Sequence, residues 1–169
     1  MERVQSVRKW IRTHHVCFVA SDPFTIRWMT GFTGSNGLLF LDQDQLVLIT
    51  DSRYTEQGPK ELMKHGTDAN CLISPDPLKT VAELSESRDV FLDGEKFPWS
   101  VKKKLQNLID GTVVDAHEFC STMRGLKDES EIAKIKKAAD YAKQNFLEVH
   151  AGHGLTYNSA KQIAKINSI

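Results

Sequence analysis

Residues 28–57 read WMTGFTGSNGLLFLDQDQLVLITDSRYTEQ. Three glycines recur at every third position in the first part of this stretch: Gly31, Gly34 and Gly37. Glycine lets the backbone adopt a positive φ or approach another segment closely, and it disfavours a helix. Two apolar runs follow, residues 38–41 and 46–50, joined by the polar segment Asp42-Gln43-Asp44. The pattern predicts a glycine-rich turn, a pair of strands and then the start of a charged helix.

The rest of the sequence alternates apolar strands with amphipathic helices. Apolar side chains at helical spacing predict helices at residues 2–14, 77–87 and 99–109. Residues 54–65 also have helical character, but Gly58-Pro59 sets a bend or the true start, and residues 24–29 form a short helix or an irregular piece. Further strands are predicted at residues 16–20, 71–74, 90–93 and 112–115. This alternation favours an α/β fold, and the strand pair makes the sheet mixed rather than all parallel.

Composition restricts the class of protein. A chain of 169 residues has the length of one domain, or of one domain with a fragment of a second. Lys plus Arg equals Asp plus Glu at 22 each, so no net charge favours nucleic acid or an anionic membrane. The apolar runs are too short to span a bilayer, and the first residues lack the apolar block of a signal peptide. Three widely spaced cysteines indicate reduced, mostly buried thiols in a cytoplasmic protein.

The residues, order and spacing of the stretch 28–57 resemble the amino-terminal domain of creatinase, prolidase and the Xaa-Pro aminopeptidases. In that family a GFTGSNG segment, a strand pair and a TD-small-RY-x-x-Q segment follow one another. The resemblance implies a six-stranded mixed sheet flanked by helices, in a layout similar to ribonuclease H. Ribonuclease activity does not follow, because the strand-end acids Asp51 and Asp93 give no convincing carboxylate cluster.

A second motif lies in residues 123–142, MRGLKDESEIAKIKKAADYA. Asp128 is placed as an N-cap with Glu131 three residues later, as in a capping box. An apolar stripe at helical spacing follows: Ile132, Ile135, Ala139, Ala142 and Phe146. The segment resembles the R-x-x-K-D-x-x-E-I opening of the catalytic pita-bread domain of the same peptidases. We therefore assign residues 1–122 to the amino-terminal domain and 123–169 to a truncated catalytic domain, whose helix packs on the first domain or on another copy.

The resemblance implies a peptidase whose metals lie elsewhere. The family holds two divalent ions (Mn, Co or Zn) with two aspartates, a histidine and two glutamates, all well into the second domain. No position of this chain matches those ligands, so the resemblance assigns it neither a catalytic residue nor a metal ligand. We expect a non-catalytic domain of a metal-dependent Xaa-Pro aminopeptidase or dipeptidase, inactive alone, that shapes the substrate entrance and supports a homodimer. Proline-containing peptides are the partners implied for the intact enzyme. The alternative is a stand-alone, non-enzymatic interaction domain.

Arg53, in the TDSRY segment, is the one residue to which the resemblance gives a binding role. In the family this arginine can lie near the catalytic entrance and approach the substrate. The alternative is an arginine that pairs with an acid and anchors the end of the strand. Trp99 follows a proline and opens a predicted helix, so it is the tryptophan most suited to a partly exposed contact.

The last residues, 146–169, read FLEVHAGHGLTYNSAKQIAKINSI. They are similar to the L-E-V-x-A-G-H-G-L-T-Y strand and loop of pyridoxine 5′-phosphate synthase, where the loop histidine, here His153, belongs to the active site. One strand and part of a helix cannot close a TIM barrel, so we expect no catalytic role for His153. The similarity reflects coincidence or a fused or frame-shifted end. His150 and His153, with Glu148 nearby, are expected to be a solvated pair rather than a metal site.

Overall fold

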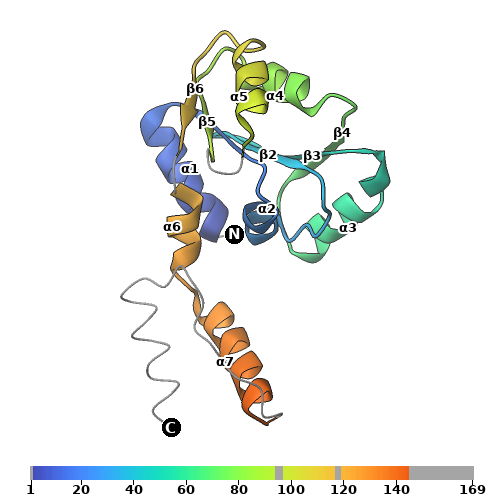
Figure 1. Ribbon diagram of the computed structural model, residues 1–169, viewed down its shortest axis with the longest axis vertical. Helices are drawn as coiled ribbons and strands as arrows, with labels where there is room; N and C mark the ends of the chain where they lie inside the picture. The colour runs from blue at the N-terminus through green and yellow to red at the C-terminus, as the bar shows by residue number, and fades with distance from the viewer. Residues whose placement is uncertain (1, 94–96, 117–118, 145–169) are drawn as a thin grey trace. The chain divides into compact units, whose positions relative to one another are not determined.

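A computed structural model describes residues 2–93, 97–116 and 119–144 (Figure 1). The contacts divide the chain into two units, Met1–Phe119 and Cys120–Ile169. The first unit contains the whole sheet, and the division falls within helix α6, Phe119–Gly125. That residues 123–169 open a catalytic domain stays a prediction.

The first unit is built on one six-stranded sheet. Its strands are β1 (Cys17–Ala20), β2 (Leu38–Leu41), β3 (Leu46–Thr50), β4 (Asn70–Ile73), β5 (Val90–Leu92) and β6 (Val113–Asp115). They lie in the order β4-β3-β2-β1-β5-β6. The pairs β1–β2 and β2–β3 are antiparallel, and the other three pairs are parallel. The predicted mixed six-stranded sheet is confirmed.

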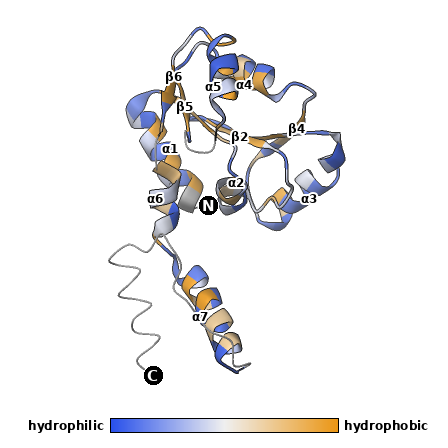
Figure 2. Ribbon diagram, in the orientation of Figure 1, coloured by the Kyte–Doolittle hydropathy of each residue, from blue (hydrophilic) through white to orange (hydrophobic). Residues whose placement is uncertain are grey.

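Helices cover both faces of this sheet. They are α1 (Glu2–His14), α2 (Pro23–Thr30), α3 (Gln57–Lys64), α4 (Pro77–Ser85) and α5 (Trp99–Gln106), with a 3₁₀ turn η1 (Ser52–Tyr54). Figure 1 shows α4 and α5 on one side of the sheet and α1, α2 and α3 on the other. Phe40 packs in a buried cluster with Val81 of α4 and Leu105 of α5. On the other side the ring centroids of Trp10 and Phe91 lie 5.1 Å apart. Burial on both faces explains the nearly continuous hydrophobicity of the central strands β1, β2 and β3, whereas the edge strand β4 is mostly exposed (Figure 2).

The β2–β3 pair is the predicted hairpin, and Asp42 organises its turn. Phe40 pairs with Val47 in the antiparallel register. The backbone N–H groups of Asp44 and Gln45 donate to Asp42 Oδ1 at 2.9 and 2.8 Å. The Asp42 side chain is almost fully buried, and its Oδ2 accepts a 3.1 Å hydrogen bond from Arg88. The turn is therefore fixed by a buried carboxylate with four donors around it, because Gln45 Nε2 also donates to it.

Two predicted helices end earlier than the sequence pattern indicates. Helix α4 ends at Ser85 rather than at residue 87, because Glu86 and Ser87 adopt φ values of 47° and 67°. Both lie in the left-handed region that non-glycine residues rarely adopt. Helix α5 ends at Gln106 rather than at residue 109. The Gln106 amide instead bonds the chain beyond the helix, donating to the Gly111 carbonyl at 3.0 Å and accepting from the Val113 N–H at 2.7 Å.

The predicted helical segment 54–65 divides into two elements. The turn η1 ends at Tyr54, and α3 begins at Gln57. Pro59 thus lies in the first turn of α3, where a backbone N–H would have no helical partner in any case. The interpretation of Gly58-Pro59 as the true helix start is confirmed. The segment 24–29, predicted as a short helix or an irregular piece, forms the regular helix α2. Asp22 caps this helix, and its carboxylate accepts from the Thr25 N–H at 3.1 Å.

The second unit contains α7, Glu129–Gln144. Its predicted capping box is present: the Asp128 N–H donates to Glu131 Oε2 at 3.1 Å, and the Glu131 N–H donates to Asp128 Oδ1 at 2.9 Å. The docking of this helix on the first domain or on another copy stays a prediction. Phe146, Glu148, His150 and His153 lie outside the described residues.

The cysteines form no disulfide within the described residues. Cys17 and Cys120 are buried and Cys71 is partly buried, as the sequence predicts. Burial raises the pKa of the Cys17 thiol to about 11, so this side chain stays a neutral, unreactive thiol near neutral pH. No helix in the described part of the chain is long and apolar enough to cross a membrane.

Candidate functional site

The hairpin brings the two ends of the stretch 28–57 together, where strand β2 begins and strand β3 ends. The glycine-rich loop, residues 31–37, precedes β2, and η1 follows β3. Because β2 and β3 are antiparallel, Leu38 at the start of one strand pairs with Ile49 near the end of the other. Thr50 Oγ1 then donates a 2.7 Å hydrogen bond to the Asn36 carbonyl oxygen. Residues of the GSNG and DSRY segments therefore lie in contact.

Asp51 joins the loop to η1. Its Oδ2 accepts from Asn36 Nδ2 at 2.6 Å, and its two oxygens accept from Arg53 Nε and Nη2 at 2.9 and 2.8 Å. The hydrogen bonds from Arg53, with a second contribution from Asn36, hold the pKa of the Asp51 carboxyl well below its usual range. The Arg53 side chain remains 66% exposed. The pairing of Arg53 with an acid at the strand end is thus observed, and its role toward substrate stays a prediction.

Tyr54 binds the same loop at Ser35. The Ser35 N–H donates to Tyr54 Oη at 3.1 Å, and Ser35 Oγ lies 2.9 Å from that oxygen. These hydrogen bonds lower the pKa of the Tyr54 phenol. The Phe32 ring meets the Tyr54 ring edge-on at 5.3 Å. Gly34 permits this packing, because a Cβ there would lie 2.1 Å from Phe32 Cζ.

A second carboxylate, Glu61 of α3, binds the start of the loop. The Thr33 N–H donates to Glu61 Oε2 at 2.7 Å and Thr33 Oγ1 donates to Oε1 at 2.6 Å. Gln57 Nε2 donates to the same Oε1 at 3.2 Å. Burial raises the pKa of Glu61, but the hydrogen bonds from Thr33 and Gln57 outweigh it, so the pKa is lowered overall. Glu61 was not predicted from the sequence; its spacing of four residues from Gln57 on a helix was the available signal.

Gly31 ends α2 and is the position where this arrangement requires glycine most strictly. Its φ is 78°, and its N–H donates to the Arg27 carbonyl at 2.8 Å. A Cβ at Gly31 would lie 2.0 Å from His65 Cδ2. We expect Gly31→Ala to lower the free energy of unfolding by about 2 kcal/mol, because it combines left-handed strain with displacement of the His65 ring.

Gly66→Ala is the matched control for Gly31→Ala. Gly66 has a φ of 62°, but a Cβ there would meet no atom of the described residues within 4 Å. It should cost only the backbone strain, about 1 kcal/mol. Urea unfolding of both variants measures the difference. Equal losses would show that His65 does not restrict Gly31.

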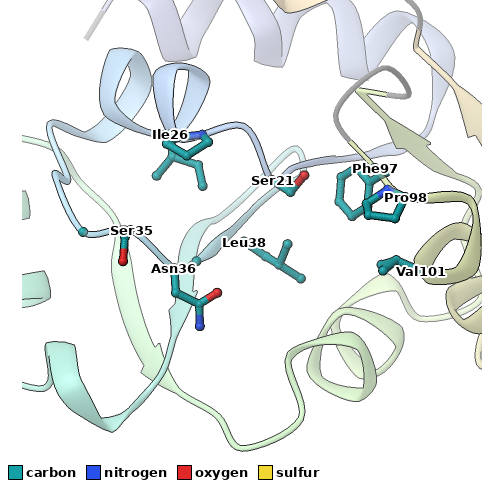
Figure 3. Close-up of a pocket in the computed structure, with 11 residues that line it drawn as sticks. Ser21, Ile26, Ser35, Asn36, Leu38, Phe97, Pro98 and Val101 are labelled. Atoms are coloured by element: carbon teal, nitrogen blue, oxygen red, sulfur yellow. The ribbon is translucent and has the colours of Figure 1, made fainter.

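A small cavity of about 190 Å³ lies beside the loop (Figure 3). Ser35 and Asn36 line it on one side of Leu38, and Phe97 and Pro98 line it on the other. This volume is below that of a drug-sized ligand site and is closer to the size of one side chain. Trp99, which follows Pro98, is 75% exposed, as the sequence predicts.

The described residues do not fit a metal centre. Within residues 2–93, 97–116 and 119–144, no three His, Cys, Asp or Glu side chains lie together as ligands of an ion would. Asp51 pairs with Arg53, and Asp93 is almost fully buried. No metal-dependent step can be assigned to these side chains.

Comparison with known proteins identifies the family of the first unit. The profile of the creatinase/prolidase N-terminal domain matches residues 3–126. The uncharacterized peptidase YqhT of Bacillus subtilis is 29% identical over 133 residues, which cover 73% of this chain and 35% of YqhT. The crystal structure of X-Pro aminopeptidase from Thermotoga maritima has a TM-score of 0.68 at 25% identity, over 87% of this chain and 47% of that one. The N-terminal domain of cytoplasmic peptidase PepQ from Mycobacterium tuberculosis has a TM-score of 0.64 at 20% identity, over 73% and 98%.

A second match concerns the other enzyme that the tail resembles. Pyridoxine 5′-phosphate synthase of a Sulfurihydrogenibium species is 56% identical over 45 residues, which are 27% of this chain and 18% of the enzyme. The chain thus spans about a third or less of the length of these two curated relatives. The family profile, by contrast, covers the whole sheet and both carboxylate contacts of the loop. On that match the chain belongs to the creatinase/prolidase N-terminal domain family.

Proposed function

We propose that the chain is the non-catalytic amino-terminal part of a metal-dependent Xaa-Pro aminopeptidase or dipeptidase, and that loop 31–37 and η1 shape its substrate entrance. The observation that supports this most directly is the exposed Arg53 guanidinium, held by Asp51, which also accepts a hydrogen bond from Asn36 in the lining of the cavity of about 190 Å³. The substrate class is proposed by analogy with the X-Pro aminopeptidase from Thermotoga maritima.

Arg53 is suited to bind a peptide carboxylate. A guanidinium carries five N–H donors in a planar fork. Asp51 takes hydrogen bonds from Nε and Nη2, which fixes the plane of the fork and leaves other donors of Arg53 for a ligand. The neighbouring Ser35 and Asn36 line the cavity, which is large enough for a small side chain. In this proposal Arg53 binds the carboxylate of a proline-containing peptide, and Asp51 positions Arg53.

The test is titration of the ¹⁵N-labelled full chain with an Xaa-Pro dipeptide, followed by NMR. We expect shifts of the backbone amides of Ser35, Asn36 and Arg53. Arg53→Gln should weaken binding at least about tenfold, the effect of losing one charge-assisted hydrogen bond of about 1.5 kcal/mol. Arg12→Gln, a change at an exposed arginine of α1, is the matched control and should leave binding unchanged. Equal affinity of the Arg53→Gln and unaltered chains would contradict the role of Arg53.

The proposal also predicts which activity the chain lacks by itself. We propose that the two divalent ions (Mn, Co or Zn) are held by residues of the intact peptidase outside the described ones. The purified chain should then release no amino acid from an Xaa-Pro-Xaa peptide in the presence of manganese. Release that depends on manganese would contradict a non-catalytic role.

The assembly and location proposed are a homodimer in the cytoplasm. PepQ, which the first unit resembles, is named as a cytoplasmic peptidase. Trp99 is 75% exposed and would supply an apolar contact for a second copy. Sedimentation velocity tests the dimer. A monomer that binds no Xaa-Pro peptide would instead favour the alternative, a stand-alone interaction domain.

A further inference from the structure

Asn36 has a chemical property that its role in the loop does not explain. It precedes Gly37, and this is the single Asn-Gly pair among the 169 residues. The Asn36 side chain is exposed, and its amide nitrogen lies 2.6 Å from Asp51 Oδ2. Gly37 has no side chain to shield its backbone nitrogen, and a Cβ there would be in ordinary van der Waals contact, 3.4 Å from the Ile49 carbonyl oxygen and from Leu48 Cδ1, so alanine would fit at this position. The hydrogen bond to Asp51 is therefore made by the side-chain amide of an asparagine that precedes glycine. This sequence context favours the chemical loss of the amide group.

We propose that Asn36 is a site of spontaneous deamidation, and that the reaction separates loop 31–37 from Asp51. The backbone nitrogen of Gly37 loses its proton to solvent and attacks Cγ of Asn36. A new N–Cγ bond forms, the Cγ–Nδ2 bond breaks, and Nδ2 leaves as ammonia with a proton from water. Water then hydrolyses the cyclic succinimide at either carbonyl, which gives aspartate or isoaspartate at position 36. Water is the only co-reactant.

Deamidation turns the attractive contact between position 36 and Asp51 into a repulsive one. A donor amide is replaced by a carboxylate at the position where 2.6 Å separated Nδ2 from the Asp51 oxygen. Two ionised carboxylates at that distance repel each other. Arg53 already donates to both oxygens of Asp51. The carboxylate that faces the new one therefore already has both of its oxygens in hydrogen bonds. In isoaspartate the backbone also runs through the former side chain, which displaces the Asn36 carbonyl that accepts from Thr50. The loop keeps its contact with Glu61 and loses the one with Asp51.

The reaction is tested by incubating the purified full chain at mildly alkaline pH and mapping its peptides by mass spectrometry. Asn70 and Asn107 are exposed asparagines that do not precede glycine, so they serve as controls within the same molecule. We expect Asn36 to deamidate about tenfold faster than either, because only its neighbour lacks a side chain. Gly37→Ala should remove this difference. Equal rates at the three asparagines, or no slowing by Gly37→Ala, would overturn the proposal.

The consequence is tested with Asn36→Asp, which carries the new charge from the start. Asn36→Ala is the matched control, since it removes the hydrogen bond to Asp51 without adding a charge. In Asn36→Asp the Ser35 amide, which donates to Tyr54 in the unaltered chain, should exchange its hydrogen faster than in Asn36→Ala. The pKa of Tyr54, followed by NMR of a labelled ring, should rise toward its ordinary value of 10.0. If Asn36→Asp changes neither quantity more than Asn36→Ala, charge repulsion does not release the loop.

Discussion

Phe40→Ala is expected to lower the free energy of unfolding by about 3–5 kcal/mol, the largest effect of any change considered for this chain. Phe40 is fully buried on strand β2, between β1 and β3. It pairs with Val19 on one side and Val47 on the other, and it belongs to the cluster beneath α4 and α5. Alanine would remove most of these contacts and leave a cavity that the neighbouring strands cannot fill without breaking their register.

Phe24→Ala is the matched control for Phe40→Ala. Phe24 lies on α2 and is 72% exposed, so its truncation should change the free energy of unfolding by less than about 0.5 kcal/mol. Urea unfolding followed by circular dichroism gives both values. Similar losses for the two variants would mean that β2 does not lie at the centre of the core.

Asp42→Ala is expected to lower the free energy of unfolding by about 3 kcal/mol, because it leaves several donors in a buried turn without their acceptor. The N–H groups of Asp44 and Gln45 donate to Oδ1, and Arg88 Nη2 donates to Oδ2 at 3.1 Å. Arg88 also donates to the Leu84 and Ser85 carbonyls, so it cannot leave the site without further loss. The change should therefore loosen both the hairpin turn and the end of α4.

The same carboxylate makes stability depend on pH. Burial raises the pKa of Asp42, but the hydrogen bonds from the N–H groups of Gln45 and Asp44 and from the Arg88 guanidinium outweigh burial, so the pKa lies below its ordinary value. A lowered folded-state pKa contributes stability that is fully present above the unfolded pKa and is lost as the pH falls through the folded one. The unaltered chain should thus lose stability below about pH 4, and Asp42→Ala should lose less over that range.

Asp44→Ala controls for the loss of a charge in the same turn. The Asp44 residue is exposed, and the turn uses its backbone N–H rather than its carboxylate. We expect a change of less than about 0.5 kcal/mol and an unaltered pH dependence. A loss as large as that of Asp42→Ala would attribute the effect to net charge instead of buried hydrogen bonds.

Features that depend on neighbouring residues could be predicted from the sequence. The hairpin register follows from two apolar runs separated by a polar turn of fixed length. The capping box of α7 follows from Asp128 and Glu131, and each partner lies within three residues of the other. The mixed sheet follows from a hairpin inserted in an alternation of strands and helices. In each case the deciding interactions are short in sequence, so the residues themselves carry the information.

Only the tertiary structure decided the ends of α4 and α5 and the contacts of the loop. Glu86 and Ser87 adopt positive φ although neither is glycine, and Gln106 turns its amide to the following strand. Thr33 and Glu61 are 28 residues apart, and Asn36 and Asp51 are 15 apart. Such contacts arise once the sheet has fixed the positions of loop 31–37, η1 and α3, so no local pattern encodes them. The sequence by itself determined which segments form this domain. The packed sheet decided which side chains meet at the ends of β2 and β3, because hydrogen bonds between distant residues depend on three-dimensional position.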